Sequence, residues 1–134
     1  NHDVTRLPTR YGGGELGRRR ARAAALLLFG LPGAAFAYQG QELGLEEIDV
    51  PDDKREDPIF HRTGGARKGR DGCRVPLPWT TEPPTFGFTA GEPWLPMPED
   101  LGLLSVEEQE RDPDSTLSLF RSALRFRPRL ISSA

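Results

Sequence analysis

Polar side chains that could bind a ligand gather at three places in the sequence. Asp3 and its neighbour His2 begin the chain, and Arg6 and Arg74 are arginines that could lie near them. A carboxylate accepts hydrogen bonds while imidazole and guanidinium groups donate them, so this set suits the binding of vicinal hydroxyl groups. The alternative is that His2 and Asp3 form only a capped turn. The three clusters are Asn1-His2-Asp3, Tyr38 to Glu42, and Asp71-Gly72-Cys73-Arg74.

The composition gives little support to metal or thiol chemistry. One cysteine, Cys73, and two histidines are a poor supply of zinc ligands. The acidic stretch from Glu46 to Asp57 lacks the regular ligand spacing and central glycine of a calcium loop, so it is predicted to be a solvated surface loop. Cys73 is expected to be a buried or half-buried thiol, since a nucleophile needs a base beside it. We therefore predict no metal and no cofactor.

Helix propensity and hydrophobic spacing indicate the elements that must position these residues. Glu15 to Leu31 is mostly Ala, Leu and Arg, which predicts a helix that becomes buried along its length. Ala34 to Tyr38 is a short apolar run flanked by glycines, typical of a strand covered on both faces in a parallel sheet, with buried helix as the alternative. Ser105 and Glu108 predict a capping box, and a further helix is expected after residues 112–114.

A long irregular segment separates the predicted strand from the last helices. The chain of 134 residues fits one domain, and residues 51–100 alone hold nine prolines and six glycines. Such a long loop in a compact domain is usually functional. The order helix, strand, loop, helix is that of an α/β protein, but one strand cannot close a sheet or cover both of its own faces. Either the rest of the sheet lies elsewhere or the strand assignment is wrong.

Charge and hydropathy argue against nucleic acid and membrane partners. The formal net charge is -2, and the arginines near residue 20 lack interleaved aromatic side chains, so they read as a solvated helix start. Arg18 to Ala37 imitates an export signal, but Pro32-Gly33 interrupts it, and its apolar part, Ala23 to Leu31, is shorter than the ~20 residues that cross a bilayer. We predict a cytoplasmic protein, with export as the alternative.

Four short motifs follow one another along the chain. They are NHDVTR at residues 1–6, GLPGAAFAYQGQELGL at residues 30–45, RDGCRVPLPW at residues 70–79 and DPDSTLSLFRSALRFR at residues 112–127. Each motif is unspecific alone, whereas four in sequence at suitable intervals are specific. In this order they resemble the α-amylase family of retaining glycoside hydrolases, and in particular its bacterial α-glucosidase and oligo-1,6-glucosidase branch. The resemblance covers Asn1 to about Leu130.

The resemblance implies a fold of which this chain holds only a part. That fold is a (β/α)8 barrel of roughly 250 residues. Residues 1–134 would be the C-terminal part of the catalytic domain, with a long proline- and glycine-rich loop at about 45–103. Strand seven would end at Asn1-His2-Asp3, with Glu15 to Leu31 as its helix. Ala34 to Tyr38 would be strand eight and Ser115 to Arg127 its helix, and the remainder of the barrel would be the necessary partner.

The resemblance also implies a reaction on short oligosaccharides. Asp3 matches the carboxylate that stabilises the transition state, with His2 beside it, whereas the nucleophile and the acid/base would precede residue 1. The chain alone is thus expected to be inactive. Arg74 would bind substrate at the rim or pair with Asp71, and Glu42 would anchor loops. The alternatives are a glucosyl-transferring isomerase and a non-catalytic carbohydrate-binding barrel.

Overall fold

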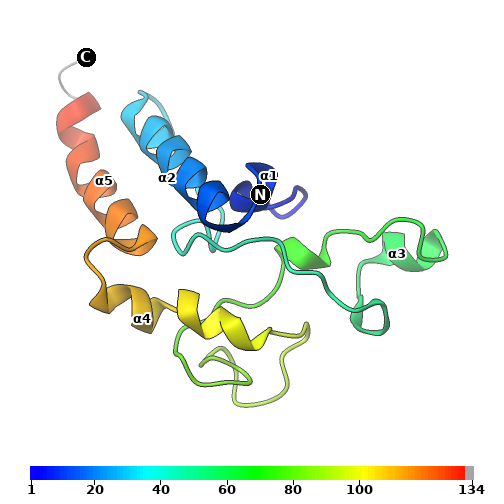
Figure 1. The fold of residues 1–134 in the computed structure, drawn as a ribbon. Coiled ribbons are helices and arrows are strands. Elements are labelled where there is room, and N and C mark those ends of the chain that lie inside the picture. The colour runs from blue at the N-terminus through cyan, green and yellow to red at the C-terminus, as the bar shows by residue number, and fades with distance from the viewer. Residues whose placement is uncertain (132–134) are drawn as a thin grey trace.

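The computed structural model describes residues 1–131, which form helices joined by long irregular segments (Figure 1). Two long helices, α2 and α5, lie side by side, while α1 packs on α2 and α4 packs on α5. The loop that carries α3 extends away from the paired helices. The helical elements in chain order are α1 (Leu7–Arg10), α2 (Gly14–Gly30), η1 (Asp52–Lys54), α3 (Pro58–Arg62), η2 (Asp71–Cys73), η3 (Glu99–Leu104), α4 (Val106–Arg111) and α5 (Thr116–Ile131).

Helix α2 confirms the helix predicted from the Ala, Leu and Arg composition of this segment. It packs tightly on α1 because Gly17 has no side chain, and a Cβ atom at this position would lie 2.2 Å from the Pro8 carbonyl oxygen. Ala25 and Phe29 are the buried side chains of its second half. The helix ends before Pro32, whose ring cannot continue the hydrogen-bond ladder. The end of α2 therefore lies where the local sequence dictates.

The two predicted C-terminal helices are also present. Ser105 caps α4, because its hydroxyl oxygen accepts a hydrogen bond from the Glu108 amide at 3.2 Å. Helix α5 packs on α2 through Phe29 and Phe120, whose rings meet edge to face with centroids 5.1 Å apart. No helix within residues 1–131 is long and apolar enough to cross a lipid bilayer.

The structure does not confirm the strand predicted over Ala34–Tyr38. Within residues 1–131 no segment is a strand, and Ala34, Phe36 and Ala37 are exposed rather than covered on both faces. The physical reason is that a strand exists only through hydrogen bonds to a neighbouring strand. The described part of the chain supplies no such neighbour, so the apolar run stays extended and open.

The irregular segment between residues 45 and 103 packs against the rest of the chain through a shared hydrophobic core. Phe86 lies fully buried in a cluster with Leu43, Leu45, Leu101 and Leu117, which joins the loop to α5. Gly102 permits this packing, because a Cβ atom there would lie 2.9 Å from a backbone oxygen. The loop is thereby fixed in place, although it contains only short helical elements.

Candidate functional site

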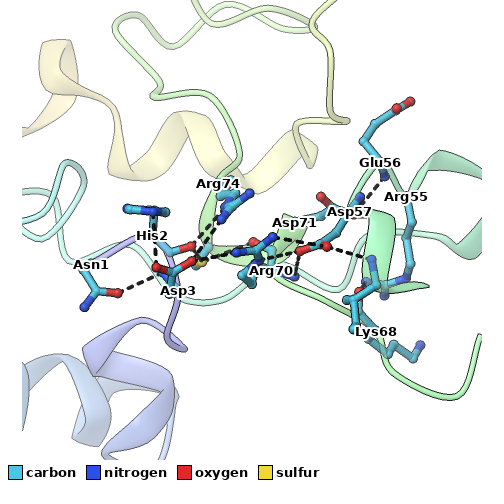
Figure 2. Close-up of polar contacts among 12 residues, drawn as sticks. Asn1, His2, Asp3, Arg55, Glu56, Asp57, Lys68, Arg70, Asp71 and Arg74 are labelled. Atoms are coloured by element: carbon cyan, nitrogen blue, oxygen red, sulfur yellow. Dashed lines mark hydrogen bonds and ion pairs between the residues drawn. The ribbon is translucent and has the colours of Figure 1, made fainter. Parts of the chain in front are cut away.

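Asp3 lies in a turn at the start of the chain, facing two arginines from a loop far away in sequence (Figure 2). Arg70 donates from Nη1 to Oδ1 of Asp3 at 2.8 Å, and Arg74 donates from Nη2 to the same oxygen at 3.1 Å. The other carboxylate oxygen, Oδ2, lies 3.2 Å from Nε2 of His2. Since 48% of the Asp3 side chain is exposed, the carboxylate is open to a ligand.

The surroundings of Asp3 keep its carboxylate ionised. The hydrogen bond from Arg70 is the largest cause that lowers the pKa of Asp3, and the charges of His2, Arg70 and Arg74 add to it against a smaller opposing effect of burial. An ionised carboxylate accepts hydrogen bonds and stabilises positive charge, but it has no proton to donate. Asp3 is therefore suited to electrostatic stabilisation and not to acid catalysis.

Arg74 joins the beginning of the chain to the turn η2. Besides its bond to Asp3, it donates from Nε to the His2 carbonyl at 2.9 Å. The alternative ion pair with Asp71 is not formed. Asp71 is buried, and its Oδ2 instead accepts from the amides of Glu56 and Asp57 at 2.9 and 3.0 Å. The structure thus brings His2, Asp3 and Arg74 together.

Arg70 and Asp57 are the two members of the cluster that sequence reasoning missed. The guanidinium of Arg70 lies between two carboxylates, with Nη1 on Asp3 and Nε on Oδ2 of Asp57 at 2.6 Å (Figure 2). These pairs raise the pKa of Arg70, the Asp57 bond first, and lower the pKa of Asp57 well below its usual range. Arg70 stood inside the motif RDGCRVPLPW, which was the available signal, whereas Asp57 belonged to no motif.

Tyr38, at the end of the predicted strand, and the following Gln39 contact Cys73 and Arg6 instead of Asp3. The Tyr38 hydroxyl donates to the Cys73 carbonyl at 3.1 Å. Arg6 is buried, stacks over the Tyr38 ring at 5.2 Å and donates from Nη1 to the Gln39 carbonyl at 2.8 Å. Arg6 is therefore a structural residue and not a second donor to the ligand site. The Cys73 thiol is buried, as expected, and burial raises its pKa.

Loop anchoring, which the sequence assigned to Glu42, is carried by the two following acidic residues. Glu47 accepts from the Arg6 amide at 3.0 Å, and its half-burial raises its pKa. Glu46 accepts from the Gly14 amide at 3.0 Å and pairs with Arg18 at 2.7 Å. These bonds hold the segment after the extended run against Arg6, which precedes α1, and against the start of α2. The acidic stretch is thus partly structural, although it was predicted to be solvated.

An open groove adjoins Asp3 on the side of α3. Its volume is about 830 Å³, and Arg62, Arg67 and Lys68 line it together with Asp57 and Arg70. Over residues 1–131 no three His, Cys, Asp or Glu side chains gather as metal ligands would. The chemistry that this arrangement offers is an ionised acceptor, an imidazole beside it, and a rim of positive charge. The acceptor and the imidazole suit a polyhydroxyl ligand, and the negative charge of Asp3 would stabilise positive charge that develops on it. The cationic rim instead favours a partially negative group.

Comparison with known proteins decides the family. The family model described as the alpha-amylase catalytic domain matches residues 1–132. The chain belongs to the alpha-amylase family. Among curated members, a probable alpha-glucosidase of Rhizobium meliloti (strain 1021) is 38% identical and an oligo-1,6-glucosidase of Heyndrickxia coagulans is 30% identical, each over 95% of this chain. The chain spans 23% and 26% of those two family members, about a quarter of their length.

Solved structures of related enzymes superpose on most of this chain. An alpha-glucosyl transfer enzyme, XgtA, is 42% identical with a TM-score of 0.86 and matches 96% of this chain and 24% of its own. The trehalulose synthase MutB of Pseudomonas mesoacidophila MX-45 is 27% identical with a TM-score of 0.80, over 97% of this chain and 27% of its own. The relatives thus include hydrolases and glucosyl-transferring or isomerising enzymes.

Proposed function

We propose that residues 1–134 are the C-terminal part of an α-glucosidase barrel and supply the carboxylate that stabilises its transition state. In this assignment Asp3 ends the seventh strand, α2 is the seventh helix, Ala34–Tyr38 becomes the eighth strand once a neighbour is present, and α5 is the eighth helix. The family membership and the match to about a quarter of each relative support it. The nucleophile and the acid/base would come from the remainder of the barrel, so the chain alone is inactive.

The observation that carries the proposal is that the two oxygens of the Asp3 carboxylate have different partners. Both arginines bind Oδ1, which leaves Oδ2 beside His2 free to accept a sugar hydroxyl. In a retaining glycosidase the sugar ring flattens toward an oxocarbenium ion as the glycosidic bond breaks. An ionised carboxylate at the hydroxyl next to the reacting carbon gains strength as that positive charge develops. His2 would donate to the same sugar, and Arg74 would hold both residues in place.

The second candidate function is transfer of the glucosyl group to another sugar instead of to water. The 42% identity to an alpha-glucosyl transfer enzyme favours it, as does the likeness to a trehalulose synthase. Asp3 would act in the same way in both reactions, because the two share the glycosyl intermediate and differ only in the acceptor. Analysis of the products formed when glucose is added as an acceptor to the reaction distinguishes the two functions. Transfer gives disaccharides, and hydrolysis gives glucose alone.

The test is Asp3→Asn in the full-length protein that carries this segment. Removing one electrostatic partner of a transition state costs about 10²- to 10³-fold in kcat, so a fall of that size is expected on an aryl α-glucoside. Asp53→Asn is the matched control, since Asp53 is an exposed aspartate on η1 and does not line the groove beside Asp3. Asp3→Asn with an unchanged kcat would remove Asp3 from the catalytic set.

A further inference from the structure

Asp57 is buried yet charged, and nothing in the proposed reaction has used it. Its side chain is fully buried, while that of its partner Arg70 is 42% exposed and that of Asp3 is 48% exposed. A buried charge is tolerated only when it is paired and hydrogen-bonded. In the row of side chains Asp57, Arg70 and Asp3, the end at Asp57 is therefore fixed inside the protein, and the end at Asp3 is exposed to solvent.

The Asp57 carboxylate accepts three hydrogen bonds from Arg70. Its Oδ2 accepts from the Arg70 amide at 2.9 Å and from Nε at 2.6 Å, and its Oδ1 accepts from Nη2 at 3.4 Å. Two parallel bonds to one edge of a guanidinium group fix the plane of that group. The third nitrogen, Nη1, is left on the opposite side, where it meets Asp3.

Asp57 is itself held by its neighbours, so that it can serve as the fixed end. Its amide donates to the buried Asp71 carboxylate at 3.0 Å, and its Oδ1 caps α3 by accepting from the Ile59 amide at 3.0 Å. Gly69 packs against it, because a Cβ atom there would lie 2.7 Å from the Asp57 Cβ. The position of this carboxylate is thus set by backbone contacts on both flanking loops.

We propose that Asp57 is a positioning residue, which acts through Arg70 to fix the orientation of the Asp3 carboxylate. This inference rests on the proposed function of Asp3. The ordered chain of contacts Asp57, Arg70, Asp3 places a buried anchor behind an exposed catalytic carboxylate (Figure 2). Without the anchor, Arg70 is free to turn toward solvent, and Oδ1 of Asp3 keeps only Arg74.

The first variant is Asp57→Asn in the full-length protein that carries this segment. An asparagine has the same shape and still caps α3 through its amide oxygen, but it places an NH₂ group where Oδ2 accepted from Arg70. Misplacing a group that acts on the transition state costs up to about 100-fold, so kcat should fall about 10- to 100-fold on an aryl α-glucoside. KM should change by less than about threefold, because binding of the ground state is spared. Asp52→Asn, in the same loop but paired with Arg55, should leave kcat unchanged.

A double-mutant cycle separates positioning from a general structural role. If Asp57 acts through Asp3, the effects of the two substitutions should not add. Asp57→Asn introduced into the Asp3→Asn enzyme should then lower kcat by no more than about twofold, which is about the uncertainty of such a cycle. Arg70→Lys is the second variant in case Asp57→Asn does not fold. Its single ammonium group keeps the charge but cannot span two carboxylates, and it should show the same loss of kcat and the same non-additivity.

Three results of the cycle are distinct. Loss of kcat in each single variant with no further loss in the double variants supports the inference. A full further loss in the Asp3→Asn background, or no loss from Asp57→Asn and Arg70→Lys, overturns the positioning role while the proposed function of Asp3 stands. An Asp3→Asn enzyme with normal kcat overturns the proposed function, and the inference falls with it.

Discussion

At the scale of single residues, the site depends on how two arginines share one carboxylate oxygen. Arg70 and Arg74 both bind Oδ1 of Asp3, so the carboxylate keeps its charge and still presents Oδ2. A single arginine bound to both oxygens would have occupied the acceptor that a sugar needs. The cost is that two guanidinium groups must be held close together. The carboxylate of Asp57 and the carbonyl of His2 make this possible, because the first accepts hydrogen bonds from Arg70 and the second accepts one from Arg74.

The ion pair of Asp57 predicts a pH dependence of stability. The folded state lowers the pKa of Asp57, through Arg70 first, so the folded protein favours the ionised form more than the unfolded chain does. The stabilisation is complete above the unfolded pKa of about 3.9 and is lost as the pH falls toward the lower folded pKa. The melting temperature of Asp57→Asn should therefore lie below that of the natural full-length protein at pH 6, and the difference should begin to narrow as the pH falls below about 4.

Thermal unfolding of the full-length protein from pH 3 to pH 8 checks this. Asp53→Asn controls for the loss of one negative charge, since Asp53 is exposed on the neighbouring turn η1. A difference between natural and Asp57→Asn protein that stays constant over the whole range would mean that Asp57 contributes by packing and not by its charge.

At the scale of elements, features set by neighbouring residues were predictable and features set by distant ones were not. The helix over Glu15–Leu31 and the Ser105 cap follow from propensity and local hydrogen bonds, and both are present. The strand at Ala34–Tyr38 needs a partner outside the segment, and the described residues hold none. The same distinction explains the site: His2 and Asp3 are adjacent in sequence, but Arg70 reaches them from 67 residues away along a loop that no periodicity predicts.

Gly17 gives a prediction for the packing of α1 on α2. In Gly17→Ala the new methyl group would lie 2.2 Å from the Pro8 carbonyl oxygen, which is backbone and cannot rotate away. The two helices must separate, at a cost of about 1–3 kcal/mol for overpacking a tight contact. Gly30→Ala is the matched control, because a Cβ atom at Gly30 meets nothing within 4 Å.

The midpoints of thermal unfolding of the two glycine variants, in the full-length protein, give the comparison. Gly17→Ala should melt several degrees below the natural protein, and Gly30→Ala should melt at or slightly above it, since alanine favours the helical state over glycine. Equal melting temperatures for both variants would show that α1 yields without cost and that it does not hold the start of the chain in place.

At the scale of the whole molecule, many of the exposed large apolar side chains lie in one part of the fold, while Leu103, Trp79 and Trp94 are exposed elsewhere. This part comprises α2, the extended run after it, and α5, where α2 and α5 stand side by side (Figure 1). The large exposed apolar side chains there are Leu16, Leu26, Leu27, Leu31, Phe36, Leu124, Phe126 and Leu130, between 50% and 84% exposed. An apolar surface of this extent marks an interface. In the proposed barrel, the neighbouring strands and helices would cover it.

The same surface predicts opposite effects of one substitution in two contexts. Leu27→Lys puts a charge on a side chain that is 67% exposed in this chain and would be covered in the barrel. The isolated chain of residues 1–134 should then scatter less light and bind less of a hydrophobic dye than the natural sequence, because its apolar surface is smaller. The full-length protein should lose about 2–5 kcal/mol of stability, because the lysine charge would be buried without a partner.

Leu103→Lys, on η3 and 74% exposed, is the matched control and should change the stability of the full-length protein little. If Leu27→Lys leaves full-length stability unchanged, the α2 surface is solvated in the complete protein and the barrel assignment of this helix is wrong.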